Sequence, residues 1–278
     1  KLQNEVAQKI AIAIEAKVTS AEMEQIEQKP TDNLLAYDYY LQGLSHYNIR
    51  TNDELTKAIS FFEKAIEQDP EFALAYANIA FSYYYIDIFQ KEKKYTEQIN
   101  NNADKALLYN AKSAESLIAK ATYYMHIKEY RLALPHLEKA LEYNPNSSSV
   151  VNMLSNLYAN YIPNTSKYLT YALKGIQLDI AANDSITKSY IYLNLSNALI
   201  QNGFIEEANA YIDRSLNYNP NNYFGPYVKA YILYAKDKDL EQTKKSLIRE
   251  LQKDTTRLDI LQEVAKLYYY QEDYDTAF

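Results

Sequence analysis

The sequence predicts an all-α chain, organised as an α-solenoid, a superhelical array of stacked helical hairpins. Three observations carry this prediction: a repeated segment, apolar residues that recur at helical spacing, and a scarcity of glycine. Only 4 of the 278 residues are glycine, which leaves little material for β-hairpin turns or for glycine-rich phosphate-binding loops. The composition therefore disfavours an all-β fold and a nucleotide-binding α/β fold.

Three similar nine-residue segments, at 62–70, 137–145 and 212–220, read FEKAIEQDP, LEKALEYNP and IDRSLNYNP. Each ends in proline, which cannot continue a helix and therefore marks the connection to the next unit. This pattern resembles the tetratricopeptide repeat (TPR), a helix–turn–helix unit of 34 residues. The resemblance implies about seven repeats, with these bounds: 34–72, 73–113, 114–147, 148–188, 189–222, 223–256 and a last repeat from 257, truncated in its second helix.

Small residues recur at the eighth position of each predicted first helix. Small side chains there let two helices approach closely, so we expect these residues to be buried where helices meet. We expect the same of Ala58, Ala133 and Ala208 on the second helices. The residues at the eighth position are Gly43, Ala80, Ala121, Ser155, Ser196, Ala230 and Ala265.

Residues 1–30 precede the array, which is predicted to span 31–278. Apolar residues every four positions between 2 and 17 predict an amphipathic helix, which we expect to pack on the first repeat or on another molecule. The stretches 4–14 and 30–43 resemble a junction in bacterial regulatory proteins, where a TolB-like module is joined to C-terminal TPRs. The resemblance implies a tail or linker from an upstream module and a role in bacterial signalling. We expect the chain to be a piece of a longer cytoplasmic protein.

The sequence contains no catalytic or metal-binding motif. It has no cysteine, and its three histidines, His46, His126 and His136, do not have the spacing of metal ligands on one helix. Its net charge of −7 disfavours nucleic acid as a partner, and no apolar run is long enough to cross a membrane. We therefore expect a protein that is not an enzyme, with no cofactor, no metal, no nucleic-acid partner and no membrane insertion.

Tyrosine is unusually abundant, at 30 of 278 residues against 8 phenylalanines. Core positions and composition account for about two-thirds of them. We expect the others, together with amide side chains, to line the concave face formed by the first helices, because tyrosine and amide groups suit binding surfaces. Tyr40 and Tyr47 also fall at such positions. The candidate site residues are Tyr84, Tyr85, Asn152, Asn156, Asn160, Tyr190, Asn197, Gln201, Tyr227, Tyr231 and Tyr234.

The leading hypothesis is a non-catalytic scaffold that binds a peptide or protein partner in this concave groove, in bacterial signalling or regulation. We expect Asn156, Asn197, Tyr227 and Tyr231 at its centre, and few cations. The lysine and arginine of the carboxylate clamp found in chaperone-binding TPRs are absent from the corresponding positions. The alternative is a structural module that docks on its own upstream domain or forms a homodimer, without an external ligand.

Overall fold

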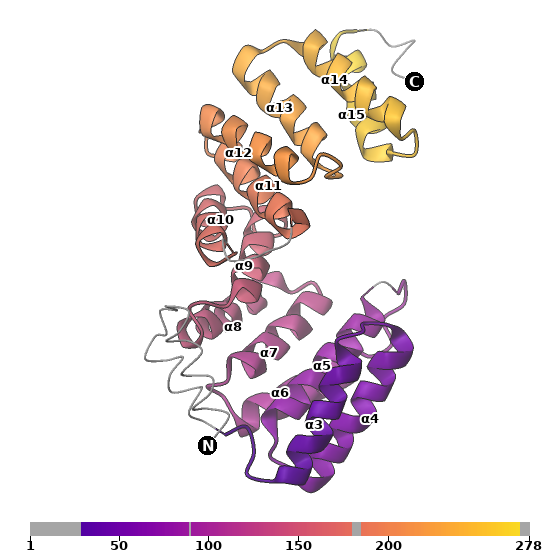
Figure 1. Cartoon of the computed structure of the whole chain (residues 1–278), viewed down its shortest axis with the longest axis vertical. Coiled ribbons are helices and arrows are strands. Elements are labelled where there is room, and N and C mark those ends of the chain that lie inside the picture. Colours follow the sequence, from indigo (N-terminus) through magenta and orange to yellow (C-terminus); the bar gives the residue numbers. More distant parts are fainter. Residues whose placement is uncertain (1–28, 89, 180–184, 273–278) are drawn as a thin grey trace. The chain divides into compact units, whose positions relative to one another are not determined.

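The computed structural model describes residues 29–88, 90–179 and 185–272, and in these ranges it contains helices and turns but no strand (Figure 1). The predicted all-α array of helix–turn–helix repeats is confirmed. The helix predicted at 2–17 lies outside the described residues, as do the last six residues. The helices are α3 Leu34–Tyr47, α4 Asn52–Gln68, α5 Ala73–Asp87, α6 Thr96–Tyr109, α7 Ala114–His126, α8 Tyr130–Tyr143, α9 Ser148–Asn160, α10 Thr165–Asp179, α11 Ser185–Gln201, α12 Ile205–Tyr218, α13 Gly225–Asp237, α14 Leu240–Lys253 and α15 Leu258–Tyr270.

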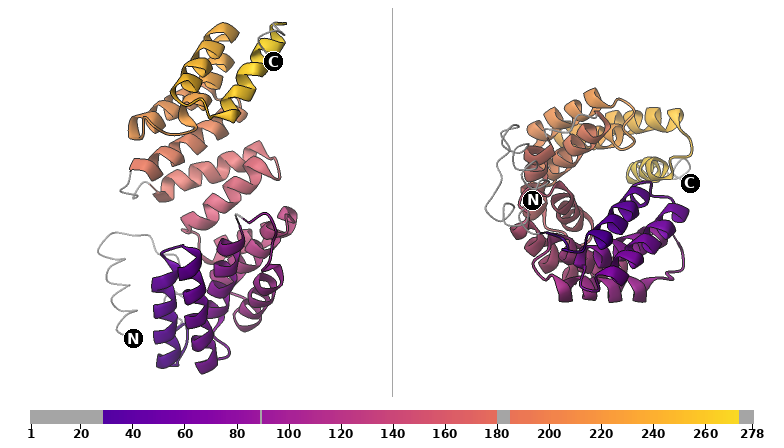
Figure 2. Two further views of the ribbon diagram at one scale, coloured as in Figure 1. Left: turned by 90° about the vertical axis from the view of Figure 1, so that its right-hand side faces the viewer. Right: turned by 60° about the horizontal axis from the view of Figure 1, so that its bottom comes forward.

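The chain divides into two compact units, Lys1–Leu154 and Ser155–Phe278. Within the first unit, α3 packs on α4, α5 on α6 and α7 on α8, so that each repeat is one helical pair. The antiparallel pair formed by α3 and α4 is seen from two further directions in Figure 2. Within the second unit, α11 packs on α12 and α13 on α14. Within a unit, each pair leaves one apolar face, which the next pair covers.

The eighth positions of the first helices are close contact points, as predicted, except Ala265 on α15, which is only half-buried. Gly43, Ala80, Ala121 and Ser196 are buried. At Gly43 the approach is so close that a Cβ atom would lie 2.4 Å from Cε1 of Phe62, whose ring is fully buried. The first repeat therefore requires glycine where the other repeats carry alanine or serine.

The alanines of the second helices complete these contacts. Ala58, Ala133 and Ala208 have no exposed surface. The hydroxyl of Ser196 on α11 donates a hydrogen bond of 2.8 Å to the backbone carbonyl of Ala208 on α12. A side chain as short as serine can reach a backbone on the neighbouring helix only when the two helices are in close contact. The predicted register of the repeats is thereby confirmed at these positions.

A residue with a left-handed backbone occurs in four of the turns between paired helices and in the turn after α15. These residues are Arg50, Lys128, Gly203, Lys238 and Glu272, with φ between 58° and 83°. Only one of them is glycine, although a residue with a Cβ atom pays about 1–2 kcal/mol in this conformation. The four charged residues are exposed. Arg50, Lys128 and Lys238 lie where the chain turns from the first helix of a repeat to the second, and Glu272 follows α15.

A lysine latch joins consecutive repeats at two places. In the first unit, Lys120 on α7 reaches back to α6, where its Nζ lies 2.8 Å from Asn100 Oδ1 and 2.6 Å from Asp104 Oδ1. The ammonium also lies 4.8 Å from the ring centre of Tyr123. The same latch recurs in the second unit between α13 and α12: Lys229 with Asn209 (2.6 Å) and Asp213 (2.7 Å). In each case an asparagine and an aspartate of the preceding helix hold the lysine side chain in place.

Candidate functional site

Helix α9 presents the predicted stripe of amides. Asn152, Asn156 and Asn160 are exposed and follow one another at intervals of four residues, so they lie along one face of the helix. Asn160 donates a 3.3 Å hydrogen bond to the backbone carbonyl of Asn156. Among the described residues, the side-chain amides of Asn152 and Asn156 have no hydrogen-bond partner. Asn152 belongs to the first unit, whereas the other two belong to the second.

Helix α11 continues this chemistry within the second unit. Tyr190 and Gln201 are exposed and Asn197 is half-buried. The three residues are spaced so that they share one face of the helix. In the described part of the chain, the side-chain amides of Asn197 and Gln201 also lack hydrogen-bond partners. Both amides are therefore available to a ligand as donor and acceptor.

Helix α13 supplies the aromatic part of the candidate site. Tyr227, Tyr231 and Tyr234 are half-buried, and the rings of Tyr227 and Tyr231 lie 5.0 Å apart with a 56° angle between their planes. The hydroxyl of Tyr231 donates a 2.6 Å hydrogen bond to Glu263 on α15. Burial and the neighbouring Glu263 carboxylate raise the pKa of Tyr231, so its hydroxyl remains a donor to Glu263. Tyr231 thus offers its ring, while its hydroxyl is engaged within the protein.

The two candidate tyrosines of the first unit lie beside a cation that the sequence reasoning missed. Tyr85 is exposed, and its ring makes an edge contact with Tyr84 at 5.5 Å. The guanidinium of Arg50 lies 4.1 Å above the centre of Tyr85 and 3.8 Å from that of Tyr47. Arg50 was missed because it comes from a turn rather than from a first helix. The signal available in the sequence was the insertion around 50–53, which makes the first repeat longer than 34 residues.

Two tyrosines expected on the concave face are buried instead. Tyr40 accepts a 3.1 Å hydrogen bond from Asn78 and packs against Phe62 and Phe72. Burial raises the pKa of Tyr47 to about 12, although the nearby arginine acts in the opposite direction. Both rings belong to the core of the first repeat, because the extended first repeat carries large aromatic side chains around the small Gly43. They are not part of a ligand surface.

Many of the remaining tyrosines stack in pairs rather than facing solvent. Parallel or nearly parallel pairs join the helices of a repeat or the segments beside them, and such stacking adds to the free energy gained from burial. The pairs include Tyr76 with Tyr109 (5.6 Å), Tyr83 with Tyr95 (4.9 Å) and Tyr158 with Tyr171 (5.7 Å). This packing role accounts for part of the tyrosine excess.

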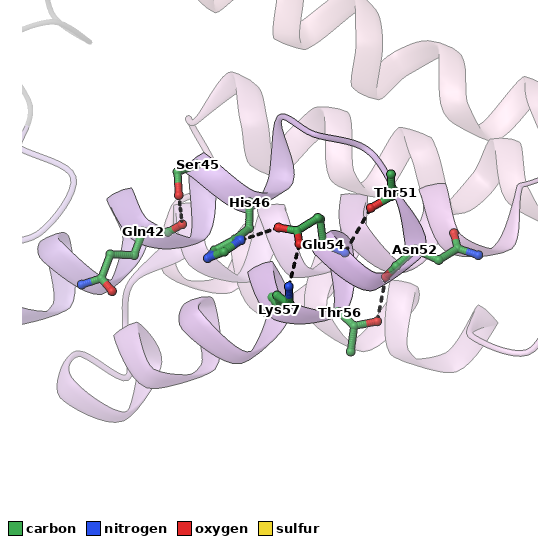
Figure 3. Close-up of polar contacts among 8 residues, drawn as sticks. All are labelled: Gln42, Ser45, His46, Thr51, Asn52, Glu54, Thr56 and Lys57. Carbon is green, nitrogen blue, oxygen red and sulfur yellow. Dashed lines mark hydrogen bonds and ion pairs between the residues drawn. The ribbon is translucent and has the colours of Figure 1, made fainter.

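The histidines form structural contacts. His46 Nδ1 lies 2.5 Å from Glu54 Oε2, and Lys57 donates a 2.7 Å hydrogen bond to the same carboxylate (Figure 3). These two contacts hold the pKa of Glu54 below its ordinary value. His126 lies 3.0 Å from Thr96 Oγ1. Within the described ranges, no group of three or more histidine, aspartate or glutamate side chains is arranged to hold a metal ion.

The TPR family matches the chain at residues 114–147 and 189–222, the bounds expected for the third and fifth repeats. The C-terminal part of a TPR repeat-containing protein from Cytophaga hutchinsonii superposes with a TM-score of 0.59 at 16% identity, over 86% of this chain and 92% of that chain. YrrB, described as a TPR protein with an unusual peptide-binding site, superposes with a TM-score of 0.50 at 18% identity, over 76% of this chain and 98% of that chain. These structures share the fold.

A sequence relative is the response regulator aspartate phosphatase E of Bacillus subtilis (strain 168), 30% identical over 122 residues. The match spans 41% of this chain but only 32% of that protein, about a third of its length.

None of the helices in the described ranges combines the length and apolar character needed to cross a membrane.

Proposed function

We propose that this chain, which is a tetratricopeptide-repeat protein, is a non-catalytic module that binds an extended peptide or protein segment in the concave groove of its first helices. The observation that carries the proposal is a set of unpaired amides and partly exposed aromatic rings on successive first helices of the second unit. Asn156, Asn197 and Gln201 offer side-chain amides without partners among the described residues, and Tyr227 and Tyr231 offer partly exposed rings.

The chemistry of this set suits a peptide backbone. Every residue of an extended peptide other than proline presents one N–H donor and one carbonyl acceptor, and a side-chain amide can pair with both. Tyrosine rings can pack the peptide's side chains at a low cost in conformational entropy. Because these residues lie on successive first helices, a peptide that crosses the helices would meet the amides before the rings.

The comparisons support a regulatory setting for such a module. One relative is named for action on response regulators, and one structural neighbour is named for a peptide-binding site. We propose from this that the partner is a protein or peptide of a bacterial signalling system. The module itself is proposed as non-catalytic, since its sequence carries no motif for a catalytic nucleophile, a phosphate-binding loop or a catalytic metal.

A second candidate function is self-association or docking on another domain. Helix α3, the first described helix, leaves Leu34 at 85% and Leu41 at 44% exposed on the same face. Such a face on a terminal repeat is usually covered. Sedimentation of the parent and of a Leu34→Gln, Leu41→Gln variant tests this candidate. A dimer that dissociates in the variant would support it, and a monomeric parent whose thermal stability is unchanged by the substitutions would exclude it.

The groove is tested with an array of immobilised extended peptides. The parent identifies binding peptides, and their affinities are then measured for Asn156→Ala, Asn197→Ala and Tyr227→Ala variants. Tyr227 is preferred to Tyr231 because truncation of Tyr231 also removes the bond to Glu263. We expect Tyr227→Ala to weaken binding by about 2 kcal/mol if its ring is a hot spot. We also expect the affinity of the parent to depend only weakly on salt concentration, because the proposed groove residues are uncharged amides and tyrosines.

The matched control is Gln252→Ala, which removes an exposed amide from α14, a second helix of a repeat rather than a first helix. Its affinities should equal those of the parent. If the three groove variants also bind the same peptides as tightly as the parent, the groove is not the binding surface. A phosphatase assay on a phosphorylated response regulator tests the non-catalytic proposal separately, since accelerated loss of the phosphoryl group would contradict it.

A further inference from the structure

A hollow of about 300 Å³ lies between the two helices of the fifth repeat. Its lining residues come from α11 and α12: Tyr192, Arg214, Asn217 and Tyr218. A volume at the lower end of the range for ligand pockets suits one or two amino-acid residues of a peptide rather than a nucleotide or a larger cofactor. All of the lining residues belong to the second unit, within a single repeat.

Three tyrosines form a row of stacked rings, and two of them, Tyr192 and Tyr218, line this hollow. Tyr192 stacks on Tyr218 at 5.5 Å with 2° between the ring planes, and on Tyr211 at 5.9 Å with 18°. The stack holds the rings in place, because rotation of one ring would collide with its neighbours. The hydroxyls of Tyr192 and Tyr218 have no hydrogen-bond partner within the described chain. The wall is therefore rigid and carries unused polar groups.

Two cations flank this row without an acidic partner. The Arg214 guanidinium lies 5.1 Å from the centre of Tyr211, and the Lys188 ammonium lies 5.7 Å from the centre of Tyr218. Neither cation forms an ion pair with a described residue, and the Asn217 side chain makes no hydrogen bond there. By contrast, Asp213, which precedes Arg214, is held by Lys229. Among the described residues that line the hollow there is no carboxylate, so the unpaired groups there are mostly hydrogen-bond donors, with the positive charge of Arg214.

The hollow is separate from the groove proposed above. Successive residues of a helix are rotated by about 100°, so Tyr192 points about 140–160° away from both Tyr190 and Asn197 on α11. Lys188 falls on the same side as Tyr192. A ligand in the hollow would therefore approach α11 from the side opposite to the groove candidates.

From these contacts we propose that the hollow binds a carboxylate side chain, glutamate or aspartate, of an acidic peptide segment. The forked N–H groups of Arg214 match the two oxygens of a carboxylate, and aromatic contact lowers the freedom of the guanidinium before binding. Asn217 lies three residues further on the same helix face and can pair with the peptide backbone beside the acidic residue. The tyrosine edges then cover the aliphatic part of the bound side chain.

The experiment compares two immobilised pentapeptide pools with degenerate flanking positions, one with central glutamate and one with central glutamine. A third pool carries phosphoserine at the centre, and free inorganic phosphate serves as a competitor. Binding is measured for the parent and for Arg214→Gln. The matched control is Arg249→Gln, which removes the same charge from an exposed position on α14 in the same unit. Circular dichroism melting of each variant verifies that all three proteins are equally folded.

We expect the parent to prefer the glutamate pool over the glutamine pool by about tenfold or more, since hydrogen bonds to charged groups are the stronger class. Arg214→Gln should abolish this preference, and Arg249→Gln should retain it. Equal binding of the two pools by the parent would overturn the proposal, as would equal loss in both variants. Stronger binding of the phosphoserine pool, with competition by phosphate, would replace the carboxylate by a phosphate ligand. A Tyr227→Ala variant that retains the glutamate preference would show that the hollow acts independently of the groove.

Discussion

Substitution of Gly43 by alanine should destabilise the first unit, although helix propensity alone predicts the opposite. Alanine is more favourable than glycine inside a helix by about 1 kcal/mol. At this position, however, the new Cβ atom would lie 2.4 Å from Cε1 and 2.6 Å from Cδ1 of Phe62. Carbon atoms in contact prefer about 3.5–4.0 Å, so α3 or the ring must move by about 1 Å.

The magnitude follows from the confinement of that ring. Phe62 has no exposed surface and packs against Tyr40 and Tyr47, so it cannot turn away without displacing other core residues. Overpacking of a well-packed core costs about 1–3 kcal/mol, and two ring atoms at such short distances place this substitution in the upper part of that range. After the gain in helix propensity is subtracted, we expect a net loss of about 1–2 kcal/mol.

The assay is urea unfolding followed by circular dichroism, with hydrogen exchange of α3 and α4 to assign the change to the first unit. Gly43→Ala is measured in the parent and in a Phe62→Val background, where no atom remains at the Cδ1 and Cε1 positions nearest to the new methyl group. In that background alanine should stabilise, as its helix propensity predicts. An increase in stability of about 1 kcal/mol in both backgrounds would refute the close contact between α3 and α4 at Gly43.

Three further predictions concern the same fold. Ala133→Leu should overpack the fully buried contact on α8 and cost about 1–3 kcal/mol, which thermal melting measures, and a variant that melts like the parent would contradict the register. Lys128→Gly should remove the steric cost of a left-handed backbone at a residue with a Cβ atom and raise the free energy of unfolding by about 1 kcal/mol. Gly203→Ala should lower it by a similar amount, and a change of the same sign in both variants would show that the positive φ is not the cause. Burial lowers the pKa of His126 and His136 below the ordinary 6.5, so the unfolded chain takes up protons first as pH falls. Stability from this source is therefore complete above pH 6.5 and declines as pH falls through the lowered values, and His126→Gln should reduce that decline in pH-dependent unfolding.

The repeat pattern predicted the parts of the fold that depend on residue size at fixed spacing. Ala133 and Ala208 could be placed at helix contacts because only a small side chain fits where two helices approach closely. Contacts between long side chains were harder to predict. The bond from Tyr231 to Glu263 joins residues 32 apart, and either residue read alone is compatible with a solvated surface.

In the candidate site, too, features that depend on residue spacing could be predicted, whereas contacts of long side chains could not. Exposed asparagines on α9 follow from spacing, because positions four residues apart share a helix face. Arg50 lies against the rings of Tyr47 and Tyr85 because it belongs to a turn that is longer than in a 34-residue repeat. Assigning groove residues from their positions along the first helices therefore could not identify it. The lysine latches were detectable in principle. Lys120 follows its two partners by 20 and 16 residues, and Lys229 follows its own partners by the same intervals.

The latches also bear on where such a chain can be shortened or extended. Each one joins the second helix of one repeat to the first helix of the next, so a deletion that begins at Ala114 would leave Asn100 and Asp104 without their cation. The exchangeable piece of this molecule is then a second helix together with the first helix that follows it. Duplication in this frame would copy a complete charged contact, whereas duplication of the repeat as conventionally bounded would divide it. The unit whose duplication preserves these contacts therefore begins at a second helix, whereas the unit recognised in the sequence begins at a first helix.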